Sequence, residues 1–255
     1  MKKLFVLLGL IVSMTVPPIS ARCEQLPTLS GFKQPIARCL KPSGNLIITQ
    51  VGSYQESPDG TPPLEIVASV QPDTDPNVIT EFDHAAINIY GPGCHLIYRQ
   101  EFSGSGEVTF ETIHLGDQTL LHLIAMSAVD EPTDDVIYGH ILLAGYGGSF
   151  FPVQPPFLQS DKNVSIFIGD IGGGRGPGIV ETFRPWPAPP HFSPFSVMFQ
   201  LKNVALPQGQ TLTTFVGPTV IRPPLHKNSL DAWPDTSYAT GFPLMHYLYG
   251  KWGGG

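Results

Sequence analysis

The chain has 255 residues, with 14 Lys and Arg against 21 Asp and Glu, which gives a formal net charge of −7 at pH 7. Binding of nucleic acid without regard to sequence needs a clustered basic surface, so this balance argues against a nucleic-acid partner. The chain contains 27 glycines and 27 prolines, and only 14% of its residues are charged. This composition favours many short strands joined by turns, and therefore an all-β class.

Residues 1–21 have the features of a secretory signal peptide. Lys2 and Lys3 form a basic start, an apolar run follows from Leu4 to Val16, and Ile19-Ser20-Ala21 is a suitable cleavage site. The apolar run is shorter than the ~20 residues that a membrane-spanning helix needs. We therefore expect a secreted or periplasmic protein without a membrane span. Cleavage would remove two lysines and no acidic residue, which changes the net charge from −7 to −9.

The three cysteines are Cys23, Cys39 and Cys94. Arg22 precedes Cys23 where a lipoprotein cleavage site needs a small residue, so plain export is favoured over lipid attachment. In an oxidising compartment we expect one disulfide, Cys23–Cys39, because it closes a short loop and would pin an N-terminal segment, residues 22–44. The pairing Cys39–Cys94 stays open as the alternative. The sequence has no CxxC motif, so no zinc site is predicted.

Residues 45–255 are predicted to form a single all-β repeat domain. Apolar and β-branched residues alternate in segments that are separated by turns rich in glycine or proline. Prolines such as those in Pro185–Pro190 mark loops and edges, because proline cannot donate a ladder hydrogen bond. Strands or hairpins are expected in Leu46–Val70, Ala85–Phe102, Val108–Val129, Val136–Val153, Asn163–Phe183, Phe195–Val204, Thr211–Ile221 and Leu244–Trp252.

Three of these hairpins look like copies of one unit. Asn163–Phe183 is the clearest copy, and Val108–Val129 overlays on it without a gap when the sequence is shifted by 56 positions. A further shift of 64 positions brings in Leu46–Val70, so that Gln50 and His114 both align with Asp170. Four strands per repeat is the content of one propeller blade. We therefore expect a propeller-like array of three to four four-stranded blades, with a β-sandwich-like domain as the alternative.

The segment Ile168–Val180, IGDIGGGRGPGIV, resembles the FG-GAP or VCBS-type repeats of integrin-alpha-like β-propellers. In that family the loop is an Asp-rich calcium site. Here the alternate positions after Asp170 are Gly172, Gly174 and Gly176, which offer no carboxylate. Calcium binding is therefore not carried over from the resemblance, and no metal or cofactor is expected.

The sequence lacks the motifs that are typical of several kinds of catalysis and phosphate binding. The glycine cluster at 172–178 is not a phosphate-binding P-loop, because it lacks the lysine, contains Pro177 and leads into a strand. No GxSxG or HExxH motif occurs. His114 and His122 bracket one predicted loop and with Asp117 would hold a metal if that loop folded back. Exposed polar turn residues are the favoured interpretation.

The function predicted from these observations is that of an exported, non-catalytic binding or scaffold protein, whose propeller-like loops meet a protein or glycan partner. The candidate binding residues lie in the glycine-rich turns and in the aromatic, proline-rich part of the chain: Asp170, His114, Asp117, Arg175 and Trp186. The alternative is a secreted hydrolase, with Asp170, His114 and neighbouring glutamates gathered at a blade rim. Convergence of these side chains into one pocket would favour the hydrolase.

Overall fold

The computed structural model describes residues 29, 31–55, 62–72, 82–103, 106–128, 136–146, 148–155, 158–161, 163–183, 195–205, 211–221 and 242–249. The predicted signal peptide at 1–21, Cys23 and Trp186 lie outside these residues. No helix in the described part of the chain has the length and apolar character needed to cross a membrane.

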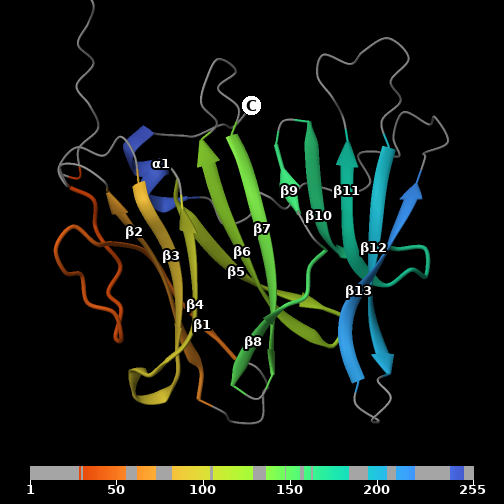
Figure 1. Ribbon diagram of the computed structural model, residues 1–255, viewed down its shortest axis with the longest axis horizontal. Helices are drawn as coiled ribbons and strands as arrows, with labels where there is room; N and C mark the ends of the chain where they lie inside the picture. Colours follow the sequence, from red (N-terminus) through yellow and green to blue (C-terminus); the bar gives the residue numbers. More distant parts are fainter. Residues whose placement is uncertain are drawn as a thin grey trace, which may run out of the picture.

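The described residues form three antiparallel sheets in which strands follow one another in chain order (Figure 1). The first sheet contains β1 (Ile47–Tyr54), β2 (Leu64–Pro72), β3 (Phe82–Tyr90) and β4 (Leu96–Ser103). The middle sheet contains β5 (Val108–Leu115), β6 (Gln118–Ala128), β7 (Val136–Tyr146) and β8 (Ser149–Pro152), and β9 (Gln159–Ser160) pairs with β7. The third sheet contains β10 (Val164–Asp170), β11 (Pro177–Phe183), β12 (Phe195–Ala205) and β13 (Thr211–Ile221).

The all-β class and the expected hairpins over residues 46–221 are therefore confirmed, and the strands form three antiparallel sheets of four to five strands. Strand alternation explains why local sequence was enough: successive side chains point to opposite faces, so a buried strand shows a period of two. The β5–β6 turn illustrates the local control. Gly116 takes a φ of +63°, which glycine adopts at little cost in a tight hairpin turn.

The three sheets stack face to face, with the middle sheet between the other two (Figure 1). Ile66 and Ile87 of the first sheet pack against Leu123 of the middle sheet. On the opposite face of the middle sheet, Leu120 packs in a second core with Ile179 of the third sheet. Since both faces of the middle sheet are buried, β6 combines apolar residues on both of its sides, including Leu120, Leu121, Leu123 and Ile124.

The segment that was expected to be a final aromatic strand is instead a helix, α1 (Pro243–Tyr249). That prediction was wrong because it rested only on a run of apolar and aromatic residues. It took no account of the distant residues that contact this segment in the folded protein. The side-chain Oε1 of Glu107 accepts the backbone N–H of Leu244 at 3.1 Å and so caps the first turn. Leu244 is fully buried in the core between the first and middle sheets. Long-range packing therefore decides the helical state of this segment.

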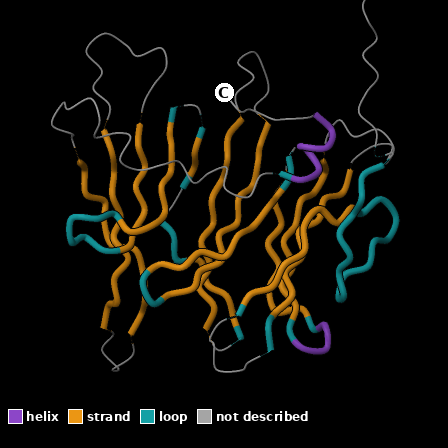
Figure 2. The backbone as a smooth tube through the Cα atoms, turned by 180° about the vertical axis from the view of Figure 1, so that it is seen from behind, coloured by secondary structure: helices purple, strands orange, loops and turns teal. Residues whose placement is uncertain are grey.

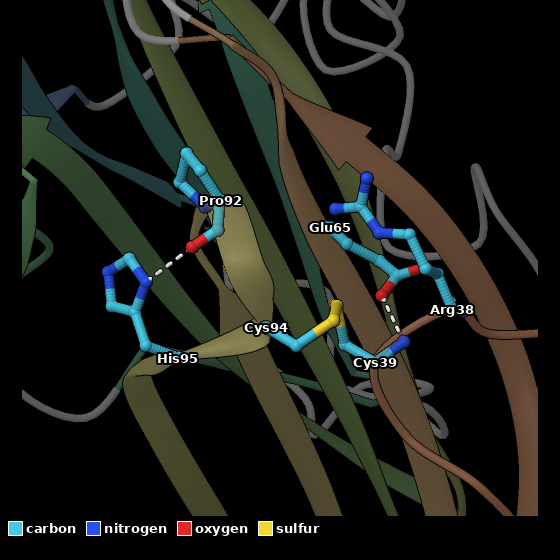
Figure 3. Close-up of a disulfide and its surroundings, with 6 residues drawn as sticks. All are labelled: Arg38, Cys39, Glu65, Pro92, Cys94 and His95. Atoms are coloured by element: carbon cyan, nitrogen blue, oxygen red, sulfur yellow. Dashed lines mark hydrogen bonds between the residues drawn. A yellow bond between two sulfur atoms is a disulfide. The ribbon is translucent and has the colours of Figure 1, made fainter.

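The disulfide joins Cys39 to Cys94, in place of the expected Cys23–Cys39 pair (Figure 3). Cys94 ends the 3₁₀ turn η1 (Pro92–Cys94) between β3 and β4. Glu65 of β2 holds the same N-terminal segment, because its two carboxylate oxygens accept the N–H groups of Arg38 at 2.7 Å and Cys39 at 2.8 Å. Cys39 and Cys94 are 55 residues apart in the sequence, so the shorter loop closed by Cys23 and Cys39 was expected. The folded sheet brings Cys94 beside Cys39.

The N-terminal segment is thereby fixed on the outer face of the first sheet. Ala37, Cys39 and Leu40 pack against a small buried cluster of that face, formed by Ile48, Val67 and Tyr90. The side chain of Gln34 adds a hydrogen bond, since its Oε1 accepts the N–H of Ile48 at 3.0 Å. The disulfide, Glu65 and Gln34 thus hold a segment without regular structure against a sheet.

Candidate functional site

The glycine-rich loop between β10 and β11 is closed by its own hydrogen bonds. Asp170 Oδ1 accepts the N–H of Gly172 at 2.9 Å, and Ile171 donates its N–H to the carbonyl of Gly176 at 2.9 Å. Four glycines of the loop have φ between +60° and +76°: Gly172, Gly173, Gly174 and Gly176. Glycine is needed at these positions because other residues rarely adopt positive φ. The loop is therefore a compact turn that leaves Asp170 and Arg175 exposed.

The β5–β6 turn carries His114 and Asp117, which are also exposed. His114 Nδ1 lies 3.1 Å from Thr119 Oγ1, and Asp117 Oδ1 accepts a hydrogen bond of 3.3 Å from the side chain of Gln118. Each side chain thus bonds within its own turn. This turn lies beside the glycine-rich loop, since a Cβ on Gly116 would be 3.5 Å from Pro177 Cγ. Figure 2 shows the described loops and turns, coloured teal, between the strands. We call residues 114–119 and 170–177 the paired turns.

Gln50, which the repeat aligned with His114 and Asp170, is not part of the paired turns. It lies in β1, and its side-chain amide connects the first and middle sheets. Its Oε1 accepts hydrogen bonds from Thr109 Oγ1 at 2.6 Å and from the N–H of Phe110 at 2.9 Å. Its Nε2 donates to the carbonyl of Phe110 at 2.9 Å. The three aligned residues therefore have different surroundings and do not form one pocket.

His114 and His122 do not combine with Asp117 into a metal site. Glu111 is directly opposite His122 across the β5–β6 pair, and His114 lies three positions further along β5. Because side chains alternate along a strand, His114 and His122 project from opposite faces of the middle sheet. Among the described residues, no three His, Cys, Asp or Glu side chains gather in a way that would hold a metal ion.

A buried hydrogen-bonded chain, not predicted from the sequence, crosses the middle sheet. His122 Nδ1 lies 2.9 Å from Glu111 Oε1, and His122 Nε2 lies 2.9 Å from His140 Nδ1. His140 Nε2 lies 2.8 Å from Ser160 Oγ. The four residues come from β5, β6, β7 and β9, and we call them the histidine relay. His122, His140 and Ser160 are 0%, 3% and 1% exposed, whereas the Glu111 side chain is 18% exposed.

The proton positions in the histidine relay follow from its partners. Two neutral rings satisfy the contacts when His122 donates from Nδ1 to Glu111 and accepts at Nε2. His140 then donates from Nδ1 and accepts at Nε2 from the Ser160 hydroxyl. All three contacts are satisfied with two neutral imidazoles. Burial, and then a positive charge on the neighbouring His122, lower the pKa of His140 to about 3, so the His140 ring is neutral.

The sequence contains one indication of the histidine relay. His122 lies between Leu121 and Leu123 in an apolar strand, and His140 lies in an apolar strand beside it. A polar side chain at a buried position needs a hydrogen-bond partner, so two such histidines on predicted neighbouring strands suggest a pair. Ser160 gave no such indication because β9 has only two residues.

Glu181 of β11 is a half-buried carboxyl on the face of the third sheet that meets the middle sheet. It lies two positions after Ile179 and therefore on the same face of β11, and Ile179 is part of the core between these sheets. Glu181 is also directly opposite Ile166 of β10, which belongs to the same core. Burial raises the pKa of Glu181 to about 7, because the ionised form loses hydration there.

A cavity of about 270 Å³ opens where the ends of the first and middle sheets meet. Its polar wall includes Glu101, Ser103, Glu107 and Ser127. Glu107 is fully buried and one of its oxygens accepts the N–H of Leu244, so this carboxyl contributes to the attachment of α1. Sites for small ligands usually have volumes of ~300–1,000 Å³, so this cavity is at the lower limit.

A scan against protein-family models and a search of curated proteins find no match for this chain.

Proposed function

We propose that this chain is an exported, non-catalytic binding or scaffold protein that presents its paired turns to a protein or glycan partner. The observation that carries the proposal is the position of two turns from different sheets side by side, with His114, Asp117, Asp170 and Arg175 exposed. Bonds within each turn fix the backbone before any partner arrives. Preorganised loops lose less conformational entropy on binding, which favours recognition.

The architecture that we propose for this role is a run of propeller-like blades. Two observations support it: each sheet is a meander of consecutive strands, and neighbouring sheets pack face to face. The β5–β6 turn of the middle sheet and the β10–β11 loop of the third sheet lie next to one another. A surface built from repeated turns is a common way for such folds to meet a partner.

Export is part of the proposal. The basic and apolar start of the sequence is typical of a signal peptide, and the Cys39–Cys94 disulfide is compatible with an oxidising compartment. The alternative, a secreted hydrolase, has less support. Asp170 and His114 bond within separate turns, and Gln50 lies in the interface between the first two sheets.

The proposal is tested by comparing variants of the full chain. The wild type is screened on a glycan array and, immobilised, against the extracytoplasmic proteins of its source cells. We expect Asp117→Ala combined with Arg175→Ala to lose at least tenfold in affinity for whatever the wild type binds, because this removes two side chains of the paired turns. Lys202→Ala, an exposed change on β12, is the matched control and keeps wild-type binding. Equal binding by the double variant and the wild type would contradict the proposal.

A further inference from the structure

One end of the Cys39–Cys94 disulfide is open to solvent. Cys94 ends the turn η1 and is exposed, whereas Cys39 is half-buried. Among the described residues, Cys94 is the only residue other than glycine with a positive φ, at +64°. Residues other than glycine rarely adopt this conformation, and those that do are concentrated at functional sites. Because a thiolate must reach one of the two sulfurs to open a disulfide, the exposure of Cys94 favours exchange.

The turn that carries Cys94 is closed by its own hydrogen bonds. Gly91 donates its N–H to the carbonyl of His95 at 2.9 Å, and Cys94 donates its N–H to the carbonyl of Gly91 at 3.1 Å. His95 Nδ1 lies 2.8 Å from the carbonyl oxygen of Pro92 (Figure 3). These bonds do not involve the disulfide. The turn should therefore keep its shape, and keep Cys94 exposed, when the disulfide opens.

Cys39, at the other end of the bond, belongs to a segment without regular structure. We call residues 33–46 the strap. Before it, Phe32 packs against the core between the first and middle sheets, and its ring centroid is 5.4 Å from that of Tyr247. After it, Ile47 begins β1. The strap is therefore fixed at both ends, and between them it pairs with none of the described strands.

Apart from the disulfide, a few contacts hold the strap on the sheet. The carboxylate of Glu65 accepts the N–H groups of Arg38 and Cys39, and Gln34 accepts the N–H of Ile48. Asn45 Nδ2 donates to the carbonyl of Pro72 at 2.8 Å. The covalent bond keeps these groups close to their partners, so its loss should increase opening of the strap.

The first sheet itself does not depend on the strap. β2 lies between β1 and β3 and pairs with both, for example through Ser69 with Ile48 and Val67 with Asn88. The inner face of this sheet packs against the middle sheet through Ile66 and Ile87. Opening of the strap would therefore uncover the outer face of the sheet without breaking the ladder.

We propose that Cys39–Cys94 is a redox-active disulfide that acts as a clasp: a dithiol opens it in the folded protein, and the strap is then released from the outer face of the first sheet. The proposal does not depend on the partner of the paired turns. It rests on an exposed disulfide that joins a rigid turn to a segment held by few other contacts.

The reaction is a thiol–disulfide exchange in two steps. A thiolate of the dithiol attacks the Cys94 sulfur, the bond between the two protein sulfurs breaks, and Cys39 leaves as a thiolate that takes up a proton. The second thiolate of the reagent then attacks the mixed disulfide and releases Cys94. The dithiol is oxidised to a cyclic disulfide, and the two cysteines gain its two electrons.

The clasp is tested on the full chain, either kept oxidised or treated with dithiothreitol at pH 8 without denaturant. Mass spectrometry after alkylation reports the disulfide, and hydrogen exchange reports opening. We expect the disulfide to be reduced in the folded protein and the amides of Arg38 and Cys39 to exchange at least ~tenfold faster. Peptides from β2 and β6 should keep their protection.

Three results would overturn the proposal. The disulfide could resist dithiothreitol in the folded protein, or its reduction could require loss of protection in all strands together. The third result is reduction of the disulfide with unchanged protection of Arg38 and Cys39. In that case the sulfurs would be reactive, but the bond would not hold the strap.

Two variants sharpen the test. Cys39→Ser combined with Cys94→Ser imitates the open clasp, so the Arg38 amide should exchange quickly without dithiothreitol, and the reagent should have no further effect. Slow exchange in this variant, as in the oxidised wild type, would contradict the proposal. Cys23→Ser is the matched control: it loses a thiol, keeps the clasp and should respond like the wild type. The wild-type comparison remains decisive even if the double variant fails to fold.

Discussion

At the scale of single residues, two inward-facing titratable groups govern how stability depends on pH. His140 is kept neutral by burial, so the folded state is weakened as pH falls below ~6.5. Glu181 has the opposite effect, because its raised pKa means that the folded state holds a proton that the unfolded chain releases. Both groups lie on faces between the middle and third sheets, where water is largely excluded.

The first prediction concerns Glu181→Gln. The pKa of this carboxyl is raised from 4.5 to about 7, so its contribution to stability is complete below pH 4.5 and is lost as pH rises to about 7. The variant should match the wild type at pH 4 and be more stable by ~1 kcal/mol at pH 8, a figure reduced for the partial exposure of the group. Urea unfolding at both pH values measures this difference. Glu101→Gln, an exposed carboxyl on β4, is the control, and a gain that is larger at pH 4 would contradict the prediction.

At the scale of elements, two segments depend on contacts with distant parts of the chain. The N-terminal segment around Cys39 is held by Cys94 and by Glu65, and α1 is held by Glu107, which is 137 positions away from Leu244. Neither segment pairs as a strand in a described sheet. Their stability therefore comes from a disulfide, caps and buried apolar contacts, and not from a ladder of backbone bonds.

The second prediction concerns the disulfide. Replacement of Cys39 and Cys94 together by serine should lower the free energy of unfolding by ~2–4 kcal/mol, because the unfolded chain regains the entropy of a long loop. Chemical denaturation under non-reducing conditions measures this loss. Cys23→Ser is a sharp control. It should leave stability unchanged, whereas a similar loss in Cys23→Ser would show that Cys23 takes part in the pairing.

At the scale of the whole molecule, the middle sheet connects the other two. Its two faces belong to different cores, with Leu123 directed to the first sheet and Leu120 to the third. Both leucines are fully buried in β6. Because β6 contributes a leucine to each core, a substitution that destabilises one core should also destabilise the other.

The third prediction tests this coupling with Leu120→Ala and Leu123→Ala. Each change should cost ~2–5 kcal/mol, which is typical for a leucine deleted from a core, and each should keep a single unfolding transition. Differential scanning calorimetry and fluorescence together would reveal separate transitions. Thr112→Ala, at an exposed position of β5, is the control with a small expected effect. If Leu120→Ala instead produced a separate early transition, the third sheet would be an independent unit.

Most of the strands of the described core were predictable, because each strand is specified by a local pattern. Alternating apolar residues and turn glycines such as Gly116 act over a few positions, so β5, β6, β10 and β11 fall within the expected hairpins. The exposure of His114 and Asp117 in a turn was also expected, since such turns join strands at the surface. The same expectation was wrong for His122, which is fully buried within β6 because both faces of the middle sheet are covered.

The sequence by itself thus determined the all-β class and the positions of most strands and hairpins. Only the tertiary structure decided the pairing of Cys39 with Cys94, the helical state of residues 243–249 and the connection of His122 to His140 and Ser160. The physical reason is the range of the interactions. Turns and strand alternation depend on neighbours in sequence, whereas disulfides, caps and buried hydrogen bonds depend on which distant groups the stacked sheets bring together.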